Sequence, residues 1–166
     1  MTRALIVVIL AGLAIGLAWP SSDKAPAAEL ASTNGERHET VLEREDNGHF
    51  YTHAKVNDEG LVHFVVDTGA SVVALTVDDA RRLGISVDPA EFTVVGEGAS
   101  GLVRGKDVML KSVEVDGKRV ENVRGVVLEG SRLSLLGQAY LSRMGSIEMT
   151  ADEMVIRPAG ARRTAS

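Results

Sequence analysis

The chain has 166 residues, of which 45% are hydrophobic and 17 are glycines, and these values fit one modest globular domain with additional segments. The absence of cysteine excludes thiol nucleophiles, cysteine-ligated zinc and disulfide scaffolds. The formal net charge is -5 and there is no long basic run to bind a phosphate backbone, so we expect no nucleic-acid partner.

The first predicted element is an apolar segment at the N-terminus. Residues 4–19 carry no charge and follow Arg3, an arrangement that keeps the N-terminus in the cytoplasm and exports the rest of the chain. A helix of this length spans about 24 Å, short of a hydrocarbon core of roughly 30 Å, so a signal peptide and a short anchor both fit. The A-x-A cleavage signal at 25–27 lies several residues past the apolar run. We interpret residues 1–19 as a single-pass inner-membrane anchor with the domain in the periplasm; the alternative is secretion to the periplasm after signal cleavage.

Composition then divides the rest of the chain. Residues 20–47 are rich in Ala, Ser, Glu and Asp without a hydrophobic period, which predicts a flexible spacer. The folded domain is expected over residues 48–158. The tail at 159–166 has no apolar period, and we expect it to be disordered.

Two predicted strands open the domain and end at an acid. Residues 49–56 alternate like a half-buried strand, and residues 57–60 have the composition of a turn. Residues 61–66 form a second, more apolar strand, so the pair predicts a hairpin that delivers Asp67 at its far end. A carboxylate at the end of a buried strand is costly to maintain, which makes it a candidate functional group, although an ordinary turn aspartate would give the same short motif.

A short helix and a second hairpin follow the acid. Thr76 is predicted to cap the helix, with Asp79 reaching back to it as in a capping box, and Gly84 to end it. Residues 92–95 are predicted to form an extended strand before the glycine-rich stretch at 96–101, and the residues from 102 onward are predicted to run back beside it. This pattern predicts a hairpin with a tip of small residues, or in a plainer interpretation a long hairpin turn.

The remainder of the domain is predicted to be sheet with one further helix. Asp116-Gly117 lies between two strand patterns and is a strong signal for a two-residue hairpin turn. The expected elements, in chain order, are strands at 108–115 and 120–127, a strand at 133–136, a two-turn helix at 138–144, and strands at 146–149 and 154–157.

This order of elements resembles one half of a retropepsin-like aspartic protease of clan AA, and it looks most like the membrane-anchored bacterial members. The resemblance covers residues 48–158 and implies a mostly β fold, a closed β-barrel half with two short helices that is active as a homodimer. It also implies that Asp67 is the catalytic acid. Thr68 would interlock with its twin across the dimer, and Gly69 would let the backbone turn close to the carboxylate.

The resemblance assigns further residues. The expected support of the active-site loop consists of Thr68, Gly69, Ala70 and Ser71. The expected substrate-binding flap is Gly98, Ala99, Ser100 and Gly101, and the expected packing under the loop is Leu135, Leu136 and Gly137.

Two positions depart from the family pattern. Related bacterial proteins tend to have Asn where Ser100 stands, and pepsin-like enzymes often have Ser where this chain has Ala70. Without that hydroxyl donor the ionised carboxylate pair is less stabilised, so we expect a pH optimum less acid than that of pepsin-like enzymes.

The chemistry of this family requires two carboxylates that share one proton, one to act on a water and one on the peptide carbonyl. The chain contains one Asp-Thr-Gly sequence. We therefore expect a symmetric homodimer with Asp67 from each copy at the two-fold axis, acting on protein or peptide substrates without a cofactor.

Other chemistries have less support in the sequence. His49 and His53 would share one face of a strand, and His63 lies on the next predicted strand. The acidic residues near these histidines are in predicted loops, so we expect no metal site. A serine hydrolase would need a Gly-x-Ser-x-Gly elbow, which the sequence lacks. The alternative function that stays open is a non-catalytic dimeric module of the same fold that binds extended peptides by strand addition.

Overall fold

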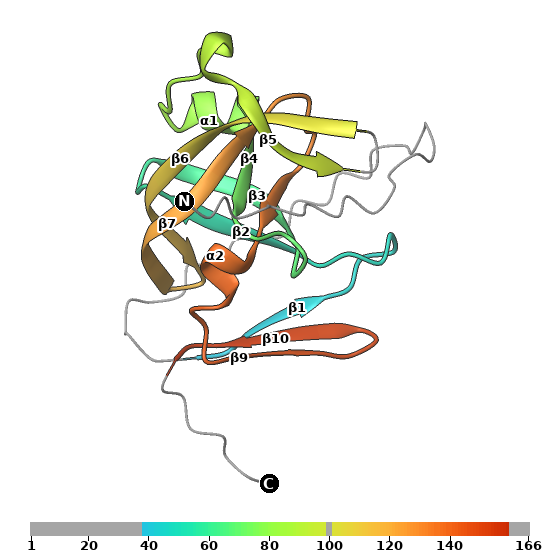
Figure 1. The fold of residues 1–166 in the computed structure, drawn as a ribbon. Helices are drawn as coiled ribbons and strands as arrows, with labels where there is room; N and C mark the ends of the chain where they lie inside the picture. Colours follow the sequence, from blue (N-terminus) through green and yellow to red (C-terminus); the bar gives the residue numbers. More distant parts are fainter. Residues whose placement is uncertain (1–37, 99–100, 160–166) are drawn as a thin grey trace, which may run out of the picture.

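The computed structural model describes residues 38–98 and 101–159, which form a mostly β domain (Figure 1). In chain order the elements are β1 (Thr40–Glu43), β2 (Tyr51–Val56), β3 (Gly60–Val66), β4 (Val73–Thr76), α1 (Val77–Arg82), a 3-10 turn (Pro89–Glu91), β5 (Thr93–Gly98), β6 (Gly101–Val115), β7 (Lys118–Leu128), β8 (Ser134–Leu136), α2 (Gln138–Leu141), β9 (Ser146–Met149) and β10 (Glu153–Arg157).

The large sheet closes on itself. Its strand order is β2-β3-β8-β4-β7-β6-β5, and β6 also pairs with β2. The ring therefore consists of β2, β3, β8, β4, β7 and β6, and β5 pairs with β6 outside it. Alternation of buried and exposed residues along β2 places one face of the strand inside this ring. The expected closed β-barrel with two short helices is confirmed.

The interior of the barrel is apolar. Phe64, Leu75, Leu110 and Leu136 are fully buried there, together with Tyr140 from α2. The Tyr140 hydroxyl donates a hydrogen bond of 2.7 Å to the carbonyl of Lys118, and burial raises the pKa of this tyrosine. The second helix is therefore fastened to the barrel by packing and by one buried polar contact.

A separate small sheet lies beside the barrel, with strand order β1-β10-β9 (Figure 1). Thr40 pairs with Ile156 in the antiparallel β1–β10 ladder. The Thr40 hydroxyl also donates to Asp116 Oδ2 at 2.6 Å and accepts from Lys118 Nζ at 2.5 Å, and the Lys118 side chain is only 4% exposed. These contacts hold the first strand against the β6–β7 turn.

The first strand corrects the predicted start of the domain. We expected a flexible spacer over residues 20–47, but Thr40–Glu43 form β1 and pair with a strand more than a hundred residues further along the chain. Four residues are too short to show a period in the sequence, and the pairing with β10 is supplied by tertiary structure, which leaves Leu42 partly buried against the main core. Residues 20–37 of the expected spacer lie outside the described residues.

The two terminal segments predicted from the sequence also lie outside the residues that the structure describes. The apolar segment 1–19 and all but the first residue of the expected tail 159–166 are not among the described residues. Within residues 38–98 and 101–159, no helix has the length and apolar character needed to cross a membrane.

The N-cap of α1 differs in part from the predicted capping box. The Thr76 hydroxyl accepts from the Asp79 backbone N–H at 3.0 Å, as expected. The Asp79 carboxylate, however, accepts from the Ser134 hydroxyl at 2.5 Å, and Ser134 Oγ accepts from the Thr76 backbone N–H at 3.1 Å. Ser134 thus stands between the two residues of the predicted box, because β8 lies beside β4 in the barrel.

The remaining predicted elements are present with small changes in length. The β6–β7 turn has φ of 48° at Asp116 and 74° at Gly117, the left-handed pair that a two-residue hairpin requires. The second helix is shorter than predicted and ends at Leu141, with Ser142 as its C-cap. The chain then turns through Gly145, whose N–H donates to the carbonyl of Arg157 in β10.

Candidate active site

The loop that carries Asp67 connects β3 to β4. The third strand runs parallel to β8, with Val66 opposite Leu136, and the Asp67 backbone N–H donates to the Leu136 carbonyl at 3.1 Å. Asp67 is therefore fixed at the point where β3 leaves the barrel.

A backbone donor orients the Asp67 carboxylate. The Gly69 N–H donates to Asp67 Oδ1 at 2.8 Å, and a Cβ at Gly69 would lie 3.3 Å from the same oxygen. Asp67 is half-buried, whereas Thr68 and Gly69 are exposed. The acid thus lies at the rim of the domain, and the desolvation cost expected from a buried strand end is smaller than the sequence suggested.

Gly137 permits a close approach beneath this loop. A Cβ at this position would lie 2.2 Å from the Val72 carbonyl oxygen and 2.6 Å from the Ala70 carbonyl oxygen. Both obstacles are backbone atoms, which cannot rotate away as a flexible side chain could. The structure therefore leaves no room for a side chain at Gly137, the last residue of the Leu-Leu-Gly element.

The start of α2 is tied to the same loop. The backbone N–H groups of Gln138 and Ala139 donate to the carbonyls of Ala70 at 2.8 Å and Ser71 at 3.1 Å. The Gln138 side chain adds a bond of 2.9 Å from Nε2 to the Thr68 carbonyl. Sequence reasoning missed Gln138 as a loop-positioning residue; its place directly after the glycine was the available signal.

A second apolar cluster connects the loop to the β5–β6 hairpin. Its buried members are Val65, Ala70, Val72, Ala74, Val126, Leu128 and Leu135. Val95 and Val103, one from each hairpin strand, pack against it. Of the residues predicted to pack under the loop, Leu135 belongs to this cluster and Leu136 to the main core. Ser71, which was predicted to support the loop itself, is exposed.

The β5–β6 hairpin projects from the barrel as an arm, defined here as residues 93–98 and 101–104 (Figure 1). The sixth strand pairs with β7 only as far as Gly105, and beyond it residues 101–104 pair with β5 alone. Gly98 pairs with Gly101 at the end of the described arm, and the predicted flap residues Ala99 and Ser100 lie outside the described residues.

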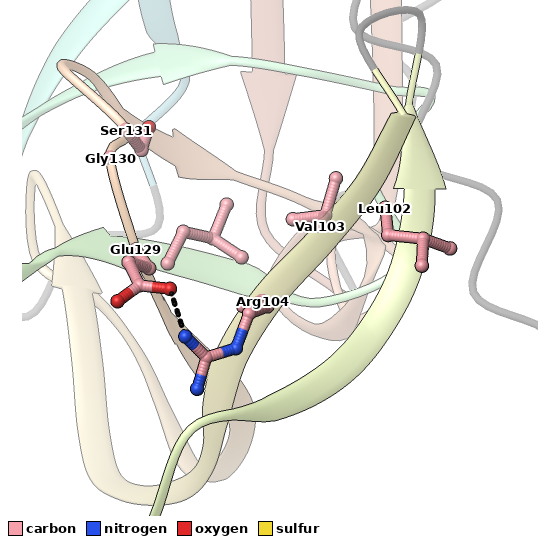
Figure 2. Close-up of a pocket in the computed structure, with 7 residues that line it drawn as sticks. Leu102, Val103, Arg104, Glu129, Gly130 and Ser131 are labelled. Atoms are coloured by element: carbon pink, nitrogen blue, oxygen red, sulfur yellow. Dashed lines mark hydrogen bonds and ion pairs between the residues drawn. The ribbon is translucent and has the colours of Figure 1, made fainter. Parts of the chain in front are cut away.

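A cavity of about 270 Å³ lies beside the arm (Figure 2). It is lined by Leu102, Val103, Arg104, Leu128, Glu129, Gly130 and Ser131. In Figure 2 Arg104 and Glu129 point toward one another, and their ion pair has an Nη1–Oε2 distance of 2.9 Å. The loop at 129–131, which lines this cavity, is not among the site residues predicted from the sequence.

The histidines form a ring stack rather than a chelating cluster. His53 and His63 are directly opposite each other on β2 and β3 with ring centroids 4.7 Å apart, and Tyr51 stacks on His63 at 5.1 Å. Burial, followed by the neighbouring charge of His53, lowers the pKa of His63. Among residues 38–98 and 101–159 no group of three or more His, Asp or Glu side chains is placed to hold a metal ion.

Comparison with known proteins gives a consistent set of relatives. Residues 52–143 match the model of the gag-polyprotein putative aspartyl protease family. A protein of Sinorhizobium sp., described as an uncharacterized protein in the cobV 5' region, is 33% identical over 79% of this chain and 56% of its own length. An uncharacterized protein of Rickettsia prowazekii (strain Madrid E) is 34% identical over 71% of this chain and 51% of its own. The chain thus spans about half the length of the curated relatives it matches.

A solved structure has a similar fold. The crystal structure of a retropepsin-like aspartic protease from Rickettsia conorii matches with a TM-score of 0.61 and 32% sequence identity, covering 73% of this chain and 90% of that chain.

Proposed function

The chain belongs to the gag-polyprotein putative aspartyl protease family and has a retropepsin-like fold, and from this premise we propose that it is an aspartic endopeptidase. Its proposed substrates are exported or periplasmic proteins, cut at internal peptide bonds. The observation that carries the proposal is the Asp67 carboxylate, held by the Gly69 N–H at the rim of the domain.

The active unit we propose is a homodimer. The sequence has one Asp-Thr-Gly, and the reaction needs two carboxylates that share a proton. A two-fold axis beside Asp67 would supply the second carboxylate from a second copy. The exposure of Thr68 and Gly69 in the single chain supports this arrangement, because it leaves the surface next to the acid accessible to a partner.

The proposed reaction is addition of water to the peptide carbonyl. One carboxylate takes a proton from the water as its oxygen bonds to the carbonyl carbon, and the protonated carboxyl of the pair gives its proton to the carbonyl oxygen. Collapse of the tetrahedral intermediate breaks the C–N bond, and a proton passes to the leaving amine. In the proposed dimer the two Asp67 groups share one proton, so the roles belong to the pair and not to one copy.

The arm is the proposed cover of the substrate. Val95 and Val103 of its strands pack against the same apolar cluster as Ala70 and Val72, so the arm and the loop that carries Asp67 share one apolar support. Small residues at 96, 98 and 101 allow the backbone changes that closing over a peptide would require.

The catalytic test is cleavage of a denatured protein by the full chain in mild detergent. Asp67→Asn keeps the size of the side chain and removes the ionisable group, so it should abolish cleavage, and a pepstatin-type inhibitor should block the wild type. Asp107→Asn, an exposed aspartate on β6, is the matched control and should cleave normally. Cleavage that persists in Asp67→Asn refutes the mechanism, and binding without cleavage in the wild type would favour the peptide-binding module.

The dimer is tested by subunit mixing. Wild-type chain is exchanged with an equal amount of Asp67→Asn chain, so that about a quarter of random dimers keep two wild-type copies. Activity per wild-type chain should then fall by about half. Activity that stays proportional to the wild-type chain present would show that one copy is sufficient.

We also propose that residues 1–19 anchor the protein in the inner membrane with the domain in the periplasm. The uncharged run after Arg3 supports this topology. Cell fractionation with N-terminal sequencing tests it: an intact N-terminus in the membrane fraction is expected. A soluble periplasmic chain that begins after residue 27 would instead identify a cleaved signal.

A further inference from the structure

The arm is held to the barrel by apolar packing, since Val95 and Val103 pack against the second apolar cluster, and by polar contacts at its base. None of the side chains described in it is buried; Val94 is 57% and Leu102 is 70% exposed. On the side facing the loop at 129–131 it borders the 270 Å³ cavity instead of filled core. On that side apolar packing therefore contributes little to fixing the angle between the arm and the barrel.

The point where the arm leaves the barrel is well defined. Gly105 pairs with Thr93 on one side and Leu128 on the other, so it is the last residue of β6 held in both ladders. The register of β5 shifts between Val94 and Gly96, as at a β-bulge, where a strand bends and pairing is interrupted. The arm thus begins directly beyond Gly105, next to an irregularity in the β5–β6 pairing.

Arg104 lies at this point and joins three segments. Its carbonyl accepts from the Glu129 N–H at 3.0 Å, and its side chain donates from Nη2 to the Phe92 carbonyl at 2.9 Å and from Nη1 to Glu129 Oε2 at 2.9 Å. Phe92 precedes β5 and Glu129 follows β7, so one guanidinium contacts the chain on both sides of the arm. Figure 2 shows the contact with Glu129.

We propose that the Arg104–Glu129 ion pair is a positioning pair for the proposed peptide hydrolysis: it fixes the angle of the arm across the cavity and thereby sets the affinity for substrate. The expected effect on substrate affinity rests on the proposed function, whereas the claim that the ion pair fixes the angle of the arm does not. Both side chains are about half exposed, so water screens the pair and its loss should loosen the arm by about 2- to 5-fold rather than unfold it.

The first measurement is amide hydrogen exchange on the full chain carrying Asp67→Asn. This substitution removes the proposed catalytic acid, so that the protein cannot cleave itself during the measurement. Amides of residues 93–98 and 101–104 should exchange about 2- to 5-fold faster in Arg104→Gln and in Glu129→Gln. The double variant should be no faster than either single one, because each change breaks the same contact. Unchanged exchange in both single variants, or additive effects in the double variant, would overturn the proposal.

Charge reversal and salt give independent checks. Arg104→Glu should exchange faster than Arg104→Gln, and adding Glu129→Arg should restore protection of the arm. Raising the salt concentration should speed exchange in the parent and have little effect on Arg104→Gln, since the screened pair is already absent there. A reversed pair that gives no rescue would show that charge is not what positions the arm.

The control is an ion pair of the same kind away from the arm. Arg119 contacts Asp58 through two nitrogens at 2.7 and 2.8 Å, and this pair links β7 to the β2–β3 turn. Asp58→Asn should leave exchange of the arm and cleavage unchanged. An equal response to Asp58→Asn would mean that the arm reports general destabilisation.

Kinetics on the active chain then test the functional part. Arg104→Gln and Glu129→Gln should raise KM for a peptide substrate by about 2- to 5-fold with kcat nearly unchanged, and the reversed pair should lower KM again. If exchange changes as expected while KM stays constant, the pair positions the arm but not the substrate, and the proposal fails. If the wild type cleaves nothing, the proposed function fails, and the exchange experiment alone decides whether the pair holds the arm.

Discussion

Replacing Gly137 by alanine is expected to displace the loop that carries Asp67. The added Cβ would lie 2.2 Å from the Val72 carbonyl oxygen, whereas ordinary Cβ contacts begin at 3.4 Å, so that carbonyl must retreat by about 1.2 Å. The Ala70 carbonyl, at 2.6 Å, must move as well, and it accepts the Gln138 N–H that ties the loop to α2. The substitution therefore strains the loop between Asp67 and β4.

The magnitude follows from the kind of contact. Overpacking against a closely packed interior costs about 1–3 kcal/mol, a large part of the roughly 5–15 kcal/mol that stabilises a domain. A displacement of about 1 Å at a catalytic group is enough to lower the rate about 100-fold. We expect Gly137→Ala to unfold at lower urea concentration and to lose most of its cleavage activity even under conditions in which it is folded.

Urea denaturation followed by circular dichroism measures the first effect, and kcat/KM at low temperature measures the second. Gly60→Ala is the control, because its Cβ would meet only the Leu83 Cδ2 atom at an ordinary 3.6 Å. The reasoning is refuted if Gly137→Ala has the urea midpoint and the activity of the Gly60→Ala control, since the loop would then have room that the structure denies.

Four further outcomes are expected. Gln138→Ala removes the bond to the Thr68 carbonyl and should lower kcat/KM while changing the free energy of unfolding by only about 1 kcal/mol; an unchanged kcat/KM would count against its positioning role. Tyr140→Phe removes the buried hydrogen bond to the Lys118 carbonyl and should cost about 0.5–1.5 kcal/mol in urea denaturation. His63 has a lowered pKa in the folded state, so stability should fall as pH drops below about 6.5, and His63→Gln should flatten that dependence. The pH optimum of cleavage should lie well above about pH 2, and a maximum there would contradict the weaker stabilisation of the carboxylate pair.

The sign of the histidine effect follows from linkage. The unfolded chain takes up a proton at His63 at higher pH than the folded chain does, so acid favours the unfolded state until both forms are protonated. Urea midpoints measured at neutral pH and near pH 5 test the effect. A steeper loss of stability in His63→Gln than in the wild type would show that the histidine is not responsible.

Features with a local cause were predictable from the sequence. The turn at Asp116-Gly117 needs two left-handed residues, and the sequence supplies a pair that adopts that conformation readily. The hairpin that delivers Asp67 follows from alternation over neighbouring residues. The helix cap at Thr76 is likewise a contact between residues close in the chain.

Features that depend on distant segments were not predictable in this way. The first strand is specified by β10, and nothing near Thr40 indicates that partner. Ser134 enters the cap of α1 from a strand 58 residues away. The bond from Gln138 to Thr68 and the pair Arg104–Glu129 also cross the fold, so each residue looks like an ordinary polar side chain until the barrel brings its partner close.

The small sheet brings the two ends of the folded domain together. Thr40 and Ile156 are directly paired in β1 and β10, so the chain enters and leaves the domain at neighbouring points. A short linker could join these ends, and the chain could be reopened at the exposed turn around Asp58 to give a circular permutant with the same barrel. The attachment point of the domain can thus be moved without rebuilding the loop at Asp67.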